Sequence, residues 1–299
     1  MSCYSPRYAL NCGLDPSTGK KHIKFLPQRV GEDFNVLSNR YGKDLITIPC
    51  GKCLSCKIAR SKSWALRCVL EASEYTDNYF VTLTYSPEFC PDKLCKDDLQ
   101  KFIRSVHDRY GWNVRYFACG EYGGLTKRPH YHIIFFNLKL DDIRGYTKGR
   151  FGGYYMKSQA LQKLWNKGHI EIGDCSYESC AYVARYTTKK FNQNQDEFII
   201  MSKRPGLGFD YYLKHYKDFY QVDRIVAPGV SGSIPRYFDK LLETVNPSML
   251  EELKANRISN ANLKMADYIL QHSLKYQEYV AVKKEELLKE KAKALKRSL

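Results

Sequence analysis

Alternating apolar and polar positions give the middle of the chain its clearest pattern. The segment YFVTLTY at residues 79–85 alternates as a strand does, whereas apolar residues recur on one helical face at residues 97–110. Glycines and a proline between residues 120 and 130 suit a hairpin loop. Strands are predicted at residues 79–85, 114–120, 130–137 and 168–173, and helices at residues 97–110, 157–166 and 177–190.

The order of these elements, β-α-β-β-α-β followed by a helix, predicts an α+β fold. It fits a split βαβ (ferredoxin-like or RRM-like) sandwich, in which helices back an antiparallel sheet. A Lys/Glu/Leu-rich end after Leu250 predicts further helix. We therefore expect an N-terminal cysteine-containing segment with a basic helix at 1–75, a core at 76–215, and a mainly helical extension at 216–299.

Composition narrows the class of partner. The 299 residues include 48 Lys and Arg against 32 Asp and Glu, and this net charge of +16 favours a polyanion such as nucleic acid or a membrane surface. No stretch is apolar enough to span a membrane, and the start MSCYSPRYAL lacks the apolar segment of a signal peptide. We therefore expect a soluble cytoplasmic protein that is not membrane-bound, with reduced cysteines.

Two histidines two positions apart are the first candidate chemistry. His130 and His132 would point to one face of a predicted strand, with Tyr131 on the other. Glu121 lies on the neighbouring strand of the same hairpin, where its carboxylate would come near both imidazoles. Such a set with open positions suits a divalent ion that acts as a Lewis acid. The alternative is that both histidines are ordinary strand residues and that Glu121 caps a turn.

The segment SCAYVARYTTKK, in the helix predicted at 177–190, is the second candidate. Tyr182 and Tyr186 are four residues apart, and Lys189 and Lys190 follow, so two phenols and an amine can share one helical face. A phenol that attacks a phosphodiester needs its negative charge stabilised, which a metal and a lysine can do. The alternative is packing, because a chain with 24 tyrosines contains such pairs by chance.

Three segments resemble the motifs of HUH endonucleases, which initiate rolling-circle replication. They are VTLTY at 81–85, GEYG at 120–123 with RPHYHIIFF at 128–136, and AYVARYTTKK at 181–190, and they occur in the order expected for the family. The paired tyrosines and the RPHYH form are most similar to the replication initiators of microviruses, especially the gokushovirus-like phages. The resemblance covers roughly residues 45–210. It departs at Tyr131, where the family usually has an aliphatic residue.

The resemblance implies a role for each matching side chain. Two histidines and a variable third ligand would hold Mg²⁺ or Mn²⁺, two tyrosines would be nucleophiles, and a lysine would face the phosphate. These roles fall on His130, His132 and Glu121 for the metal, on Tyr182 and Tyr186 for attack, and on Lys189 or Lys190 for the phosphate. We favour Lys190, because it lies a full helical turn beyond Tyr186.

The resemblance also implies a reaction. One tyrosine would attack single-stranded DNA of a viral replication origin and keep the 5′ end as a phosphotyrosine. The released 3′ hydroxyl would prime synthesis by the host replication machinery in the bacterial cytoplasm. The second tyrosine would then cleave the regenerated origin, and rejoining would close a circular genome.

Cysteines near the N-terminus suggest a separate metal site. Cys50, Cys53 and Cys56 form two overlapping CxxC pairs, which are a zinc signal, and either Cys3 or Cys12 would complete a structural Zn²⁺ site. The alternative is a set of unligated thiols.

Basic residues elsewhere are candidates for DNA contact. The helix after Cys56 carries Lys57, Arg60, Lys62 and Arg67, which either contact phosphates or form a solvated face. The loop SKRPGLGFDYY offers Lys203 and Arg204 beside glycines that let a phosphate backbone approach, although it would also serve as a plain turn. Within the matching motifs, Arg128 and Arg185 are further candidates for DNA binding.

Two other functions compete with the nickase. A non-catalytic module that binds single-stranded nucleic acid through an aromatic-rich sheet would need neither the His/His/Glu set nor the tyrosine pair, and would bind without metal or cleavage. A transposase or relaxase would keep the HUH chemistry, but relaxases are usually longer and small transposases generally carry one tyrosine. The phage initiator is therefore the favoured hypothesis.

Overall fold

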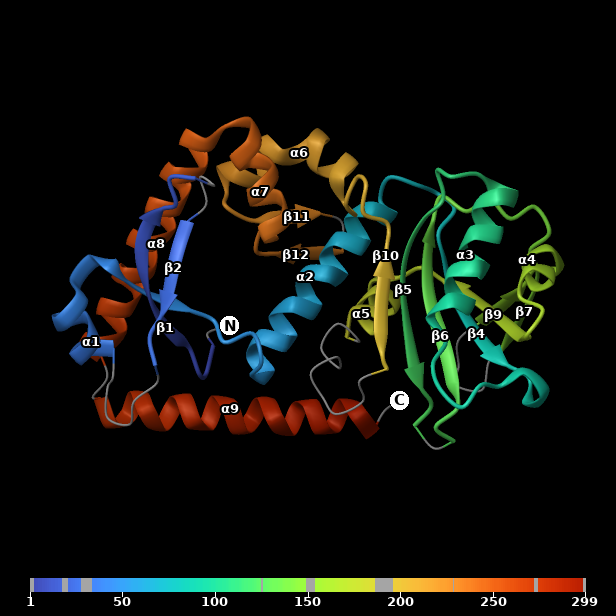
Figure 1. Ribbon diagram of the computed structural model, residues 1–299, viewed down its shortest axis with the longest axis horizontal. Coiled ribbons are helices and arrows are strands. Elements are labelled where there is room, and N and C mark those ends of the chain that lie inside the picture. Colours follow the sequence, from blue (N-terminus) through green and yellow to red (C-terminus); the bar gives the residue numbers. More distant parts are fainter. Residues whose placement is uncertain are drawn as a thin grey trace. The chain divides into compact units, whose positions relative to one another are not determined.

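The computed structural model (Figure 1) describes residues 3–17, 21–27, 34–124, 126–148, 154–185, 196–227, 229–271 and 274–297. The chain divides into two compact units. One comprises Met1–Ala59 with Leu263–Leu299, and the other comprises Arg60–Asn262. The three-part division expected from the sequence stays a prediction.

The larger unit is built on an antiparallel sheet in the order β10-β5-β6-β4-β9-β8-β7. Its centre consists of the four strands predicted from the alternating pattern. These are β4 (Tyr79–Tyr85), β5 (Arg115–Tyr122), β6 (Pro129–Phe136) and β9 (Gly168–Asp174). The sequence did not predict β7 (Arg144–Lys148), β8 (Tyr154–Lys157) and β10 (Phe198–Met201), which are short.

The predicted helices of this unit are also present. They are α3 (Lys96–Tyr110), α4 (Gln159–Leu164) and α5 (Tyr177–Arg185), and the predicted continuation of α5 to residue 190 lies outside the described residues. Helix α3 connects β4 to β5, and α4 lies between β6 and β9. Along the central sheet the order is β5-β6-β4-β9, so the strands on either side of each helix are parallel, with one antiparallel strand between them. The predicted α+β class with an antiparallel sheet is therefore confirmed.

The two faces of the sheet are covered by different helices. Alternate residues of β6 divide between two apolar clusters, because successive strand side chains point to opposite faces. Tyr131, Ile133 and Phe135 pack with residues of α3 and α4. Ile134 and Phe136 pack with residues of α5 and of the C-terminal half of α2 (Leu54–Ala72). His130 and His132 have the parity of Ile134, so they belong to the face that carries α5.

A third apolar cluster joins α2 to later helices. Leu70, Tyr212, Phe219 and Phe238 are among its buried members. The later elements are α6 (Phe209–Gln221), α7 (Arg236–Val245), α8 (Pro247–Gln271), β11 (Ile225–Ala227) and β12 (Val230–Gly232). The helical region predicted beyond residue 250 is therefore present.

The smaller unit contains strands that the sequence pattern did not predict. Strands β1 (Arg7–Leu14), β2 (Lys21–Phe25) and β3 (Leu45–Ile48) form a sheet in the order β2-β1-β3. Helices α1 (Phe34–Tyr41) and α9 (Leu274–Arg297) and the start of α2 complete it.

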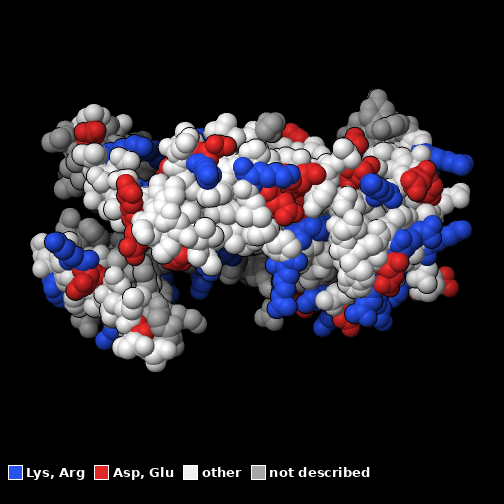
Figure 2. Space-filling model, turned by 90° about the horizontal axis from the view of Figure 1, so that it is seen from above, with Lys and Arg blue, Asp and Glu red and all other residues white. Residues whose placement is uncertain are grey.

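Charged side chains of both signs are spread over the face shown in Figure 2, where Lys and Arg lie interspersed with Asp and Glu. None of the helices within the described ranges combines the length and apolar character of a membrane span.

Candidate active site

Strand register brings the two histidines and the glutamate together. Glu121 on β5 pairs directly with His130 on β6, and Cys119 pairs with His132. On the other side of β6, Thr82 of β4 pairs with His132. Directly paired residues project to the same face of an antiparallel sheet, so the Glu121 carboxylate lies beside both imidazoles.

The three side chains have the spacing of ligands around one metal ion. The Nε2 atoms of His130 and His132 lie 3.0 Å and 2.9 Å from Oε1 of Glu121. Two ligand atoms at right angles, each about 2.1 Å from a cation, would be separated by about 3.0 Å. The side chain of Glu121 is 4% exposed and that of His130 is 18% exposed, so solvent reaches the group from the His130 side.

Hydrogen bonds to the other ring nitrogens suit metal binding. Nδ1 of His130 lies 3.2 Å from the carbonyl oxygen of Arg128, which can only accept, so Nδ1 is the donor and Nε2 carries a lone pair in the neutral ring. Nδ1 of His132 lies 3.0 Å from Oγ1 of Thr82. Two imidazole lone pairs and a carboxylate thus converge, and this donor set fits a divalent cation with open positions.

Tyr182 reaches the same group from α5. Its hydroxyl donates a hydrogen bond of 3.2 Å to Oε1 of Glu121 and lies 3.4 Å from Nε2 of His132. Its ring meets the rings of His132 and Phe80 edge to face, and Phe80 stacks on His132 at 5.4 Å. The guanidinium of Arg185 lies 5.7 Å from the Tyr182 ring centre. These contacts fix the direction of the phenol.

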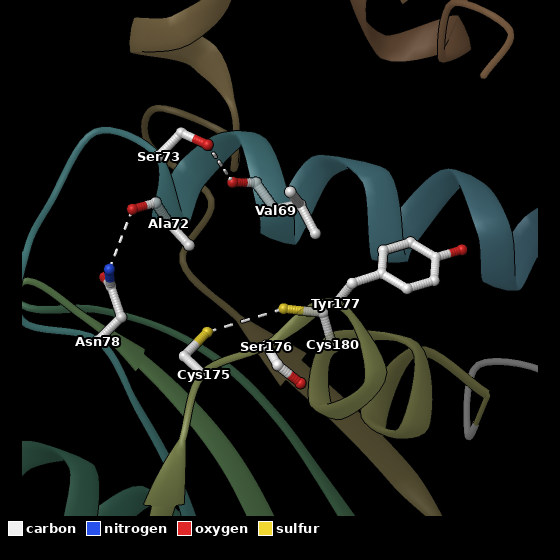
Figure 3. Close-up of a pocket in the computed structure, with 8 residues that line it drawn as sticks. All are labelled: Val69, Ala72, Ser73, Asn78, Cys175, Ser176, Tyr177 and Cys180. Atoms are coloured by element: carbon white, nitrogen blue, oxygen red, sulfur yellow. Dashed lines mark hydrogen bonds between the residues drawn. The ribbon is translucent and has the colours of Figure 1, made fainter. Parts of the chain in front are cut away.

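The start of α5 is anchored by capping and packing (Figure 3). The hydroxyls of Ser176 and Ser179 each accept a hydrogen bond from the other residue's backbone N–H, which satisfies two free amides at the helix start. Cys180 turns toward Val69 of α2 and lies 3.8 Å, sulfur to sulfur, from Cys175. Because Cys180, Val183 and Ala184 are buried, the helix is held in the rotation that turns Tyr182 to the histidines.

Part of the predicted tyrosine motif cannot be located. Tyr186, Lys189 and Lys190 lie outside the described residues. Their proposed roles, and the choice between the two lysines, therefore stay predictions.

The basic residues expected to contact DNA have different environments. Arg128 is exposed, and its guanidinium donates to the carbonyl oxygen of Tyr85 at 2.9 Å. Lys203 and Arg204 are exposed in the turn before α6. That turn is held by Glu71, whose carboxylate accepts a 2.6 Å hydrogen bond from the amide of Gly208.

Arg67 corrects the interpretation of the basic helix. It is neither a phosphate contact nor part of a solvated face, because it is only 8% exposed. Its Nε donates to the carbonyl oxygen of Leu207 at 3.0 Å, and its guanidinium lies 4.3 Å from the ring centre of Trp64 and 4.1 Å from that of Tyr237. Arg67 thus joins α2 to the turn before α6 and to α7, a contact that helical periodicity alone does not reveal.

The second predicted metal group also comes together. Cys3, not Cys12, joins Cys50, Cys53 and Cys56, whereas Cys12 is exposed. Burial alone would raise the pKa of the Cys53 thiol, but hydrogen bonds, chiefly from backbone amides, lower that pKa to about 6. Burial raises the pKa of Cys56 to about 12.

Sequence reasoning missed the support behind the histidines. Thr82 and Phe80 occupy alternate positions of a strand whose pattern was recognised, but their contact with His132 follows only from strand order. It also left Tyr131 as a plain packing residue. The Tyr131 hydroxyl is buried, donates to the carbonyl oxygen of Cys95 at 2.7 Å and lies 2.7 Å from the hydroxyl of Tyr85. Burial raises the pKa of Tyr131 to about 12.

Comparisons with known proteins agree with the location of these residues. Residues 78–191 match the family model for replication-associated proteins of the ORF2 type. Replication-associated protein ORF2 of Spiroplasma virus 4 is 35% identical over 219 residues, which cover 66% of this chain and 68% of that protein. Replication-associated protein VP4 of Bdellovibrio phage phiMH2K is 31% identical over 236 residues, which cover 73% and 75%.

A third relative is replication-associated protein ORF4 of Chlamydia phage 1, which is 31% identical over 65% of this chain and 53% of that protein. No solved structure gives a significant match. The resemblance expected from the sequence motifs is therefore confirmed, and the chain belongs to the family of phage replication-associated proteins.

Proposed function

We propose that this protein initiates rolling-circle replication of a small phage as a metal-dependent HUH nickase and strand transferase. Its substrate is single-stranded DNA of the viral origin, and its product is a covalent 5′-phosphotyrosine adduct. The observation that carries the proposal is the position of Tyr182. A phenol that donates to Glu121 at 3.2 Å and lies 3.4 Å from His132 is within reach of any phosphate bound at the His/His/Glu group.

The strand order supports an HUH core of the split βαβ type. The order β5-β6-β4-β9, with α3 and α4 as the connecting helices, is the order expected when two βα units interleave in one sheet. In this proposal the histidine strand lies at the centre of the sheet. The α5 tyrosine then approaches from the face opposite α3.

The residues act on a phosphodiester in a balanced exchange. The Tyr182 oxygen forms a bond to phosphorus, the bond from phosphorus to the 3′ oxygen breaks, and the leaving oxygen takes up a proton. Glu121 accepts the phenolic proton's hydrogen bond in the resting enzyme and so orients the nucleophile. A Mg²⁺ or Mn²⁺ ion held by His130, His132 and Glu121 would supply Lewis-acid stabilisation of the phosphate charge.

Tyr186 takes the second cleavage in this scheme, and Lys190 or Lys189 supports the phosphate. Arg128, Arg185, Lys203 and Arg204 contact the DNA backbone. Rejoining reverses the first exchange, because a 3′ hydroxyl attacks the phosphotyrosine and frees the phenol without ATP. The host replication machinery extends the first 3′ hydroxyl in the bacterial cytoplasm.

The test is a nicking assay on single-stranded origin DNA labelled at either end, with Mn²⁺ or with EDTA. We expect a metal-dependent adduct on the 5′ end of the downstream fragment, mapped by mass spectrometry to Tyr182 or Tyr186. Tyr177→Phe is the matched control, because Tyr177 lies on the same helix, is 42% exposed and lines the pocket on the α2 side of α5.

Tyr182→Phe combined with Tyr186→Phe should abolish the adduct, and Tyr177→Phe should leave it intact. His130→Ala should remove metal-dependent nicking. Adduct formation by the double variant would overturn the assignment of the nucleophiles. DNA binding without any adduct, on several origin substrates and with both metals, would instead favour the non-catalytic binding module.

A further inference from the structure

Four cysteines in the smaller unit converge on one point, although they come from distant parts of the chain. Cys3 lies in the segment before β1, Cys50 follows β3, Cys53 immediately precedes α2, and Cys56 lies in its first turn. One sulfur from each lies within 4.8 Å of the other three. We propose that these four thiolates bind one Zn²⁺ ion as a closed structural site.

The sulfur separations suit a tetrahedral zinc tetrathiolate. A zinc–sulfur distance of about 2.3 Å places tetrahedral ligands about 3.8 Å apart. The sulfur of Cys3 lies 3.8 Å from that of Cys53 and 3.4 Å from that of Cys50. Binding therefore needs adjustments of a few tenths of an ångström for these pairs, without a change of the backbone path.

Backbone amides are aimed at the sulfurs. The amides of Lys52 and Cys53 donate to the Cys50 sulfur at 3.4 Å and 3.3 Å, and the amide of Cys50 donates to the Cys3 sulfur at 3.2 Å. Donors of this kind stabilise sulfur in its anionic form, which is the form that binds metal. The tight turn that supplies them is the CxxC turn itself, and Gly51 adopts φ +73° there.

The smaller unit also needs such a staple. Among its described residues the buried apolar side chains are Ala9, Leu37 and Leu45, and none of the three apolar clusters draws on it. Small folds with so little apolar burial commonly depend on metals or disulfides. A tetrathiolate site would tie Cys3 to the end of β3 and the start of α2, so zinc binding would be coupled to folding of this unit.

The ligand set identifies the metal class. Four thiolates without an oxygen or imidazole ligand favour zinc over Mg²⁺ or Mn²⁺, and a filled tetrahedral shell leaves no position for substrate. The site is therefore structural. It is independent of the proposed nicking chemistry, and it stands or falls separately from the role of Tyr182.

The first experiment measures zinc in the purified full-length chain by elemental analysis. It uses a His130→Ala background, so that the His/His/Glu group does not contribute. We expect one zinc per chain, retained when Cys12→Ser is added and lost when Cys3→Ser or Cys56→Ser is added. Cys12 is the matched control, because it is an exposed thiol of the same unit. Equal zinc in the Cys3→Ser and Cys12→Ser proteins would overturn the proposal.

A second experiment needs no variant, so it remains decisive if the cysteine variants do not fold. Native protein is alkylated before and after zinc is stripped by a strong chelator, and each cysteine is read by mass spectrometry. Cys3, Cys50, Cys53 and Cys56 should be protected until the zinc is removed, whereas Cys12 should react at once. Disulfides among the four, or rapid alkylation of them in the native protein, would refute zinc ligation.

Discussion

Thr82→Val tests whether the hydroxyl on β4 prepares His132 to bind metal. The Thr82 Oγ1 atom lies 3.0 Å from Nδ1 of His132, directly across the strand pair. While Nδ1 donates to that oxygen, Nε2 keeps its lone pair toward Glu121. Valine has nearly the same shape and an equal preference for strands, so the substitution removes the hydrogen bond with little change to the backbone.

The expected loss follows from the position of this hydrogen bond. Removing the hydrogen-bond partner of a metal-binding histidine typically costs about 10- to 100-fold in affinity, or about 1.4–2.8 kcal/mol. The partly buried Nδ1 atom is also left without its protein partner, so the apo protein should lose about 1 kcal/mol of stability. Phe80 still stacks on the ring, so the loss should not reach that of His132→Ala.

The assay is a Mn²⁺ titration followed by the electron paramagnetic resonance signal of free Mn²⁺. Thr84→Val is the matched control. Thr84 lies on the same strand and pairs with His130, but its hydroxyl contacts the carbonyl oxygen of His169 at 3.3 Å. We expect weaker binding for Thr82→Val alone. If the two valine variants bind Mn²⁺ equally, while His132→Ala does not bind it, the Thr82 hydroxyl has no part in orienting the ligand.

Three further predictions concern stability. Gly168→Ala should cost about 1–3 kcal/mol in urea unfolding, because the new Cβ would lie 2.0 Å from a carbonyl oxygen of β4, whereas Gly173→Ala meets no atom closer than 3.8 Å and should cost less; equal losses would contradict this. Tyr131→Phe should cost about 1–3 kcal/mol, because buried hydrogen-bond partners lose the hydroxyl, and an unchanged urea midpoint would contradict that role. Burial opposes ionisation of Asp98, but its hydrogen bond with Lys167 outweighs this and lowers the pKa of Asp98 below its usual value, so its carboxylate should stabilise the fold above the usual carboxyl pKa and lose the contribution as the pH falls through the lowered pKa. Melting temperatures measured against pH should therefore fall more steeply in acid for the natural protein than for Asp98→Asn, and parallel curves would refute the assignment.

The local pattern of the sequence determined the central secondary structure and the first half of the candidate site. Period-two alternation located β4 and β6, and the same period placed His130 and His132 on one face with Tyr131 on the other. A short hairpin then set Glu121 opposite His130. These relations hold over few residues, so side-chain periodicity and turn composition are sufficient to predict them.

Only the tertiary structure decided the contacts made between distant segments. Thr82 and His132 are 50 residues apart, Cys3 and Cys50 are 47 apart, and Arg67 and Leu207 are 140 apart. The sequence left Cys3 and Cys12 as equal candidates, and it left Arg67 as a surface charge. Such pairings depend on strand order and on how helices pack across a sheet, which are set by burial summed over the whole unit and leave no periodic signal at the residues concerned.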